Sequence, residues 1–195
     1  MEYFGVATGL LYLFLEIRQH RAMWVVGILS SLVYVYVFFV SKVYATMGLN
    51  IYNVLISFYG FWQWSLQRRH ADGGLVPGGT ILYRCLTLKL SAIIFPALTL
   101  ICALIYYILE GYTDSPIPLI DAIVTGAGIV ATWMLARRIV EHWIFWIVAD
   151  GLSVYMYYAL TLYPTMLLYL CYTALAFAGY YIWKKKGIRT DDDAL

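Results

Sequence analysis

Apolar runs long enough to cross a lipid bilayer recur along the whole chain of 195 residues. A transmembrane helix needs about 20 mostly apolar residues, because each residue rises about 1.5 Å across about 30 Å of hydrocarbon. Seven segments meet or approach this length, and they cover Tyr3–Ile17, Met23–Val40, Tyr44–Leu66, Leu86–Leu109, Leu119–Ala136, Trp143–Leu162 and Thr165–Trp183. The sequence therefore predicts an all-α membrane protein with seven transmembrane helices.

The composition excludes an ordinary soluble domain. Hydrophobic residues make up 63% of the chain and charged residues 12%, whereas soluble domains have about 45–50% and about 25%. The three cysteines lie at or within apolar segments and have neither metal-ligand spacing nor a disulfide pattern. We therefore expect the lipid bilayer as a partner, and no metal, cofactor or nucleic acid.

Lysine and arginine are concentrated in alternate short loops and in the tail. They include Arg18, Arg21, Arg68, Arg69, Arg84, Arg137, Arg138, Lys184, Lys185, Lys186 and Arg189. Short loops rich in these residues face the cytoplasm. The pattern predicts a multi-pass protein of the bacterial inner membrane with its N-terminus outside and its C-terminus in the cytoplasm.

The first and last thirds of the chain resemble each other when shifted by 119 positions without gaps. Matching pairs include Gly9/Gly128, Arg18/Arg137, Trp24/Trp143, Gly60/Gly179 and Trp64/Trp183. Because one extra helix lies between the two copies, the repeats should run parallel, in a 3+1+3 plan. The predicted parts are a first repeat at 1–66, a cytoplasmic connector at 67–85, a linker helix at 86–117, a second repeat at 118–184 and a tail at 185–195.

Parallel repeats are an architecture of transporters, which hold their substrate near the middle of the membrane. A duplicated structural or assembly protein is the alternative from another class. An intramembrane enzyme is disfavoured, because His20, His70 and His142 lie in loops or at a helix start without catalytic spacing.

One carboxylate lies too deep in its span to reach the membrane interface. Glu2, Glu16, Lys89 and Asp121 lie near span ends, where we expect them to reach water. Asp150 is different, because it follows Trp143 by about seven residues, or roughly 10 Å. Intramembrane carboxylates are costly and usually functional.

Helical spacing places Trp143, Trp146, Asp150 and Tyr157 on one stripe. A carboxylate beside indole rings can bind a flat organic cation by charge attraction, cation–π contact and stacking. Alternatively, Asp150 bonds a neighbouring Ser or Tyr and only holds the bundle together, and Trp143 belongs to the interfacial belt.

The third span offers two amides, Asn50 and Asn53, and the repeat relates them to Tyr169 and Tyr172 of the seventh span. Two amides and two phenols could bond a polar, ring-containing solute. The alternative is that these groups pack helices together. Ser31, the repeat mate of Asp150, and Tyr34 are further candidates on the second span.

Several motifs together resemble the PnuC-type family of bacterial vitamin transporters. They are the WxxW of Trp143–Trp146 with its continuation to Asp150, the segment Tyr59–Trp64 that closes the third span, and the segment Gly179–Trp183 that closes the seventh. The resemblance covers about Tyr3 to Lys186.

The resemblance implies a fold similar to SWEET sugar transporters. It also implies uptake without ion or ATP coupling, trapping of the substrate by cytoplasmic phosphorylation, and a substrate site lined by Trp143 and Trp146. The expected cargo is a small cationic vitamin, either nicotinamide riboside or, because tyrosines replace an expected amide at Tyr169 and Tyr172, thiamine. The sequence leaves the oligomeric state open.

Overall fold

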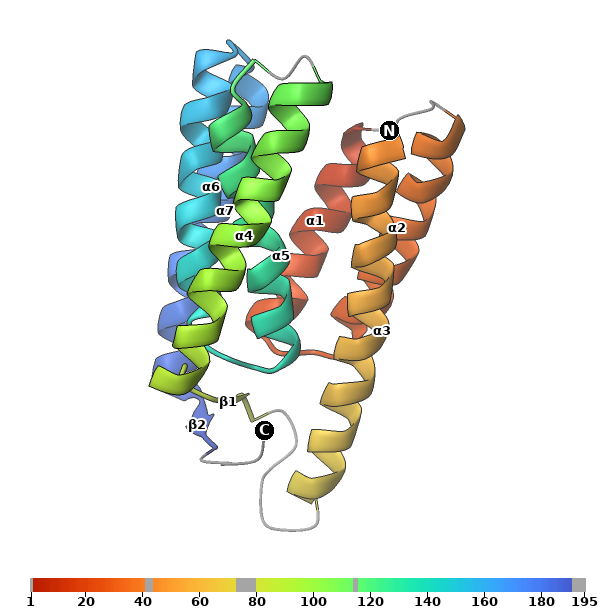
Figure 1. Cartoon of the computed structure of the whole chain (residues 1–195). Helices are drawn as coiled ribbons and strands as arrows, with labels where there is room; N and C mark the ends of the chain where they lie inside the picture. Colours follow the sequence, from red (N-terminus) through yellow and green to blue (C-terminus); the bar gives the residue numbers. More distant parts are fainter. Residues whose placement is uncertain (1, 41–43, 73–79, 114–115, 191–195) are drawn as a thin grey trace. The chain divides into compact units, whose positions relative to one another are not determined.

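The protein is all-α, with seven helices in the residues that the structure describes. The computed structural model describes residues 2–40, 44–72, 80–113 and 116–190. Figure 1 shows the helices in chain order: α1 (Glu2–Ile17), α2 (Ala22–Val40), α3 (Tyr44–Asp72), α4 (Leu88–Tyr112), α5 (Pro118–Ala136), α6 (His142–Ala159) and α7 (Tyr163–Lys186). This confirms the predicted seven-helix fold class.

Three of these helices are long and apolar enough to cross a membrane by length and composition alone, namely α4, α5 and α7. Large apolar side chains on α4 are exposed, among them Leu88 at 87% and Leu100 at 71%. In a membrane protein such side chains face hydrocarbon, where their exposure has no hydrophobic cost. Helix α3 ends at Asp72, beyond the predicted Leu66, because a polar final turn carries no hydropathy signal.

The chain divides into two compact units, and unit 1 comprises residues 1–82 and 186–188. Within it α1 packs on α2 and α2 packs on α3. Its core contains a tryptophan pair, Trp24 and Trp64, both fully buried, with ring centroids 5.4 Å apart and planes at 86°. A Cβ on Gly60 would lie 2.5 Å from the Trp24 ring. Only glycine therefore allows α3 to pack this closely against Trp24.

Unit 2 comprises residues 83–185 and 189–195. Its core contains a second tryptophan pair, Trp143 and Trp183, with centroids 5.8 Å apart and planes at 85°. A Cβ on Gly179 would lie 2.5 Å from the Trp143 ring. The same three residue types thus make the same contacts in both units, at positions 119 apart. The parallel 3+1+3 arrangement and the boundaries of its parts stay predictions.

The short loops between the first two helices of each predicted repeat also correspond. Gln19 and Arg138, again 119 positions apart, both have positive φ, 52° and 58°. In unit 1, the Gln19 side chain bonds the Leu82 backbone twice, since Nε2 donates to the carbonyl oxygen at 2.6 Å and Oε1 accepts from the amide at 2.8 Å. In unit 2, the Arg84 amide donates to the Arg138 carbonyl at 2.9 Å.

Two short strands that the sequence did not predict pair as a sheet, β1 (Leu82–Tyr83) and β2 (Ile188–Arg189). Within unit 1, the Ile188 amide donates to the Ile81 carbonyl at 2.8 Å. Within unit 2, the Thr190 amide donates to the Tyr83 carbonyl at 2.9 Å. Strands of two residues leave no alternating pattern that a sequence could reveal.

Candidate functional site

The candidate site in unit 2 begins with the stripe predicted on α6. The structure places Trp143 at its base, fully buried against Gly179 and Trp183 of α7. His142 also packs against both indole rings, with centroids 4.7 Å from Trp143 and 5.0 Å from Trp183. Trp143 thus packs α6 against α7, whereas the next tryptophan of the stripe has a different environment.

Trp146 leans on α5 and remains half-buried. The outer edge of its six-membered ring lies over Gly128, where a Cβ would be 3.5 Å from Cη2 and 3.6 Å from Cζ3. At the opposite end of the indole, Nε1 is buried without a hydrogen-bond partner among the described residues. An unsatisfied buried N–H is costly and calls for an explanation. Nε1 of Trp24 and Nε1 of Trp143 are unsatisfied in the same way among the described residues, so the feature that distinguishes Trp146 is its half-buried ring.

Asp150 follows Trp146 by one helical turn and is buried, with 8% of its surface exposed. It lies close enough to the Tyr169 phenol of α7 for electrostatic interaction. A carboxylate and an indole spaced by four residues share one face of a helix. The pair offers negative charge and an aromatic surface side by side.

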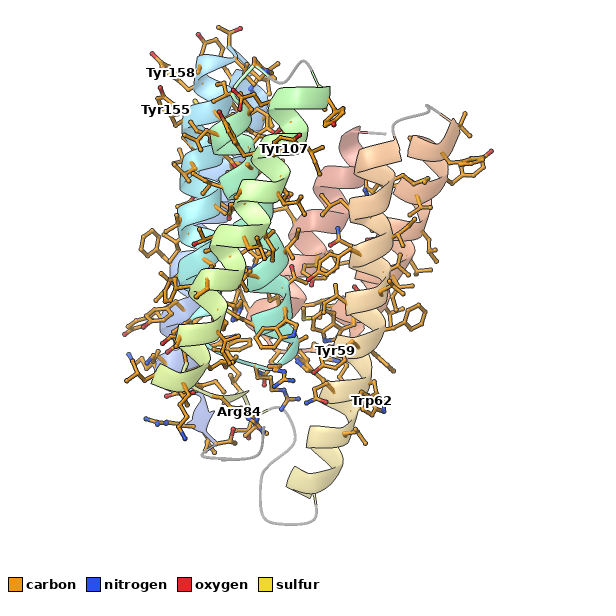
Figure 2. All side chains as sticks on the ribbon, in the orientation of Figure 1. Tyr59, Trp62, Arg84, Tyr107, Tyr155 and Tyr158 are labelled. Atoms are coloured by element: carbon orange, nitrogen blue, oxygen red, sulfur yellow. The ribbon has the colours of Figure 1, made fainter. Side chains whose placement is uncertain are left out.

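Three tyrosines extend this face from α6 to α7. The rings of Tyr157 and Tyr169 are stacked with centroids 5.1 Å apart, and their side chains share a hydrogen bond. Tyr172 meets Tyr169 edge-on at 5.7 Å. Figure 2 shows Tyr155 and Tyr158 on the outward face of α6, where 59% and 61% of their surfaces are exposed. Tyr157 is therefore the tyrosine of this segment that packs on Tyr169, whereas Tyr158 meets Tyr163, at the start of α7, edge-on at 6.4 Å.

The remaining candidates lie in unit 1. Ser31 is 8% exposed and Tyr34 is half-buried, both on α2. Asn50 and Asn53 are half-buried on α3. The structure thus assigns the amides to unit 1 and the carboxylate with its rings to unit 2, and their meeting in one substrate site stays a prediction.

Unit 1 contains a polar group that the sequence patterns did not reveal. Glu16 is only 3% exposed, so the prediction that it reaches water at a span end is wrong. Tyr12, one turn before it on α1, lies close enough for electrostatic interaction with both Glu16 and Tyr52 of α3. The signal that could have found this group is the spacing of four between ring and carboxylate, the same as between Trp146 and Asp150.

The polar groups described here are suited to binding. Among residues 2–40, 44–72, 80–113 and 116–190, no cluster of three His, Cys, Asp or Glu side chains could hold a metal ion. The histidine at the start of α6 is used structurally, since His142 Nδ1 lies 2.7 Å from the Ile139 carbonyl oxygen. Within unit 2, the aromatic rings and the buried Asp150 carboxylate can hold a flat polar cation without reacting with it.

Comparison with known proteins finds one family of transporters and relatives with similar sequences. The sequence pattern of the family described as nicotinamide mononucleotide transporter matches residues 1–185. The nicotinamide riboside transporter PnuC of Neisseria mucosa is 26% identical over 189 residues, which cover 93% of this chain and 70% of that protein. PnuC of Escherichia coli K12 is 22% identical over 201 residues, covering 94% and 84%.

A solved structure is similar as well. The crystal structure of the vitamin B3 transporter PnuC matches with a TM-score of 0.68 at 24% identity, covering 92% of this chain and 78% of that one. This likeness covers most of the chain and supports the shared fold.

Proposed function

The chain belongs to the nicotinamide mononucleotide transporter family, and on that basis we propose that it carries nicotinamide riboside across the membrane. Its curated relatives in Neisseria mucosa and Escherichia coli are nicotinamide riboside transporters. Membership makes the chain a membrane transporter, and the identity of its cargo is the proposal. The pair on α6, Trp146 and Asp150, is the observation that carries it.

Nicotinamide riboside contains a flat pyridinium ring with a permanent positive charge. The buried Asp150 carboxylate supplies the opposite charge where water screens it poorly. An aromatic face over the cation adds about 0.5–2 kcal/mol. Nε1 of Trp146, which has no hydrogen-bond partner in the described part of the chain, can donate a hydrogen bond to the amide or ribose of the cargo. These contacts together favour a flat cation over a neutral nucleoside.

Uptake without coupling to ions or ATP would then depend on trapping. A phosphorylated product carries added negative charge, and the buried Asp150 would repel it. Cytoplasmic phosphorylation would thus keep the product from binding again and returning.

Thiamine is the second candidate, because its thiazolium ring is also a flat cation. The observation in its favour is the cluster of Tyr157, Tyr169 and Tyr172. Stacked rings hold a larger aromatic cargo better than the amides expected for a riboside. Trp146 and Asp150 would serve either substrate.

Calorimetry on purified protein tests the proposal. The panel contains nicotinamide riboside, thiamine, their phosphates and a neutral riboside. We expect one unphosphorylated cation to bind, and Trp146→Ala and Asp150→Asn each to weaken it at least about tenfold, which corresponds to about 1.4 kcal/mol.

Matched controls are Trp62→Ala and Asp121→Asn, since Trp62 is 58% exposed on α3 and Asp121 lies in the first turn of α5. They should bind like the unchanged protein. Binding of no cation, together with no uptake of these cargoes by proteoliposomes, would reject the proposed cargo.

A further inference from the structure

Basic residues from three segments of unit 2 meet at one end of its helices, where Figure 2 shows Arg84. The Arg84 amide donates to the Arg138 carbonyl at 2.9 Å, which joins the segment before α4 to the loop between α5 and α6. Lys184, in the last turn of α7, lies over the Tyr83 ring with Nζ 6.0 Å from the centroid. Since Tyr83 and Arg84 are consecutive, these contacts gather positive charge at this end of the unit.

Aromatic rings lie one helical turn before these charges. Cζ of Arg137 is 4.9 Å from the centroid of Trp133 on α5. Nζ of Lys185 donates a hydrogen bond of 3.0 Å to the Tyr181 hydroxyl on α7. Tryptophan and tyrosine favour the headgroup level of a bilayer. The cations that follow these rings by four residues are therefore expected at the depth of the lipid phosphates.

An exposed apolar stripe on α7 leads to the lysines. Leu167, Leu170, Phe177 and Tyr181 are each more than half exposed. Their spacings of three, seven and four place them on one helix face, and the exposed Lys185 follows four residues later. Lipid acyl chains cover such a stripe in a bilayer. A molecule with an apolar body and an anionic end would match the stripe and the lysines together, whereas a soluble phosphate would use only the lysines.

The two lysines are specific to unit 2. The positions 119 residues earlier, in unit 1, are Ser65 and Leu66. The contact between an arginine and a ring does recur there, since Cζ of Arg18 lies 4.4 Å from the centroid of Phe14. An arginine over a ring is thus common to both units, and unit 1 offers an internal comparison that has the arginine without the lysine pair.

We propose that Lys184 and Lys185 bind the headgroup phosphate of an anionic phospholipid whose acyl chains lie along the exposed stripe of α7. An ammonium group has three donors, and the contact of Lys185 with the Tyr181 hydroxyl uses one. The others can donate to phosphate oxygens. Arg84 and Arg137 add positive charge nearby, and basic residues at a bilayer surface attract anionic lipids. The inference holds for any cargo, because it uses none of the candidate site residues.

Lipid binding to the purified full chain in detergent tests this. Native mass spectrometry measures the binding of phosphatidylglycerol and of phosphatidylcholine with the same acyl chains. We expect phosphatidylglycerol to bind at least about tenfold more tightly, and the double variant Lys184→Gln/Lys185→Gln to lose this preference. Lys184→Arg/Lys185→Arg should keep it, since the charge is retained. In the unchanged protein, a higher ionic strength should weaken the binding of phosphatidylglycerol alone, because exposed charges are screened.

Arg18→Gln/Arg21→Gln is the matched control, since it removes the same number of charges from unit 1 and should keep the preference. Equal binding of both lipids by the unchanged protein, or an unchanged preference in the lysine-to-glutamine variant, would overturn the inference. An equal loss in the control would do the same, because the attraction would then belong to the overall charge. Displacement of phosphatidylglycerol by soluble glycerol phosphate at a similar concentration would replace the lipid by a soluble anion.

Discussion

Individual glycines set how closely the helices of each unit approach. Gly60 and Gly179 face the rings of Trp24 and Trp143 at distances that leave no room for a methyl group. Gly48 and Gly151 also lie inside helices, but a Cβ added to either would have no neighbouring atom of the described residues within 4 Å. The same residue type thus has opposite consequences for stability, depending on what it faces.

Replacing these glycines by alanine should separate the two classes. Gly60→Ala and Gly179→Ala should each destabilise the protein by about 1–3 kcal/mol through overpacking. Gly48→Ala and Gly151→Ala should be neutral or stabilise it by up to about 1 kcal/mol, since alanine is the better helix former. Thermal unfolding of the purified variants measures this, and similar shifts for all four would contradict the packing described here.

Among the elements, the extended segment around β1 depends on helix–helix loops for its backbone partners. Gln19 satisfies both backbone groups of Leu82 in unit 1. In unit 2, the Arg138 carbonyl accepts from Arg84, and the Arg84 carbonyl accepts from Val140 at 2.9 Å. Because β1 is too short for a long ladder of backbone hydrogen bonds, single residues of these loops supply its partners.

Removing the Gln19 side chain should increase local opening of the segment around β1. Gln19→Ala leaves two buried backbone groups of Leu82 unsatisfied, at a cost of about 1–3 kcal/mol each. Hydrogen exchange measured on a peptide covering 81–84 should quicken, whereas exchange in α5 stays the same. Gln63→Ala on α3 provides a control of the same residue type. Unchanged exchange in Gln19→Ala would show that the strand pairing suffices.

Sequence patterns predicted the helices well and the short elements poorly. Long apolar runs are strong signals, so seven helices were found with ends such as Ile17, Val40 and Ala136 correct. The strands β1 and β2 are too short for any periodic signal. Asp150 stood out by its depth in a span, whereas Glu16 looked interfacial because it lies beside a helix end. Whether its side chain turns toward water or protein depends on tertiary packing that the sequence does not specify.

For the whole molecule, the distribution of charge predicts a direction in the membrane. Basic residues are concentrated in alternate loops and at the C-terminal end of α7, among them Arg18, Arg137 and Lys184. Since such loops stay in the cytoplasm, we propose that the N-terminus lies outside and the C-terminus inside.

Reporter fusions check this orientation. A fluorescent protein that matures only in the cytoplasm should be bright at the C-terminus, while alkaline phosphatase at that position should be inactive. A phosphatase placed between α4 and α5 should be active, because that loop is expected outside. The opposite pattern would reverse the proposed orientation.

The tryptophan pairs also determine what the intrinsic tryptophan fluorescence of this protein can report. Four of its seven tryptophans, Trp24, Trp64, Trp143 and Trp183, are fully buried in edge-on pairs. Their fluorescence should form a constant blue-shifted background, because all four indoles are buried from solvent. The ring of Trp146 is partly open, so a bound pyridinium should quench mainly this indole. A Trp146→Phe variant should keep the background fluorescence and lose the quenching by cargo. Trp146 would then be an intrinsic fluorescent probe of cargo binding.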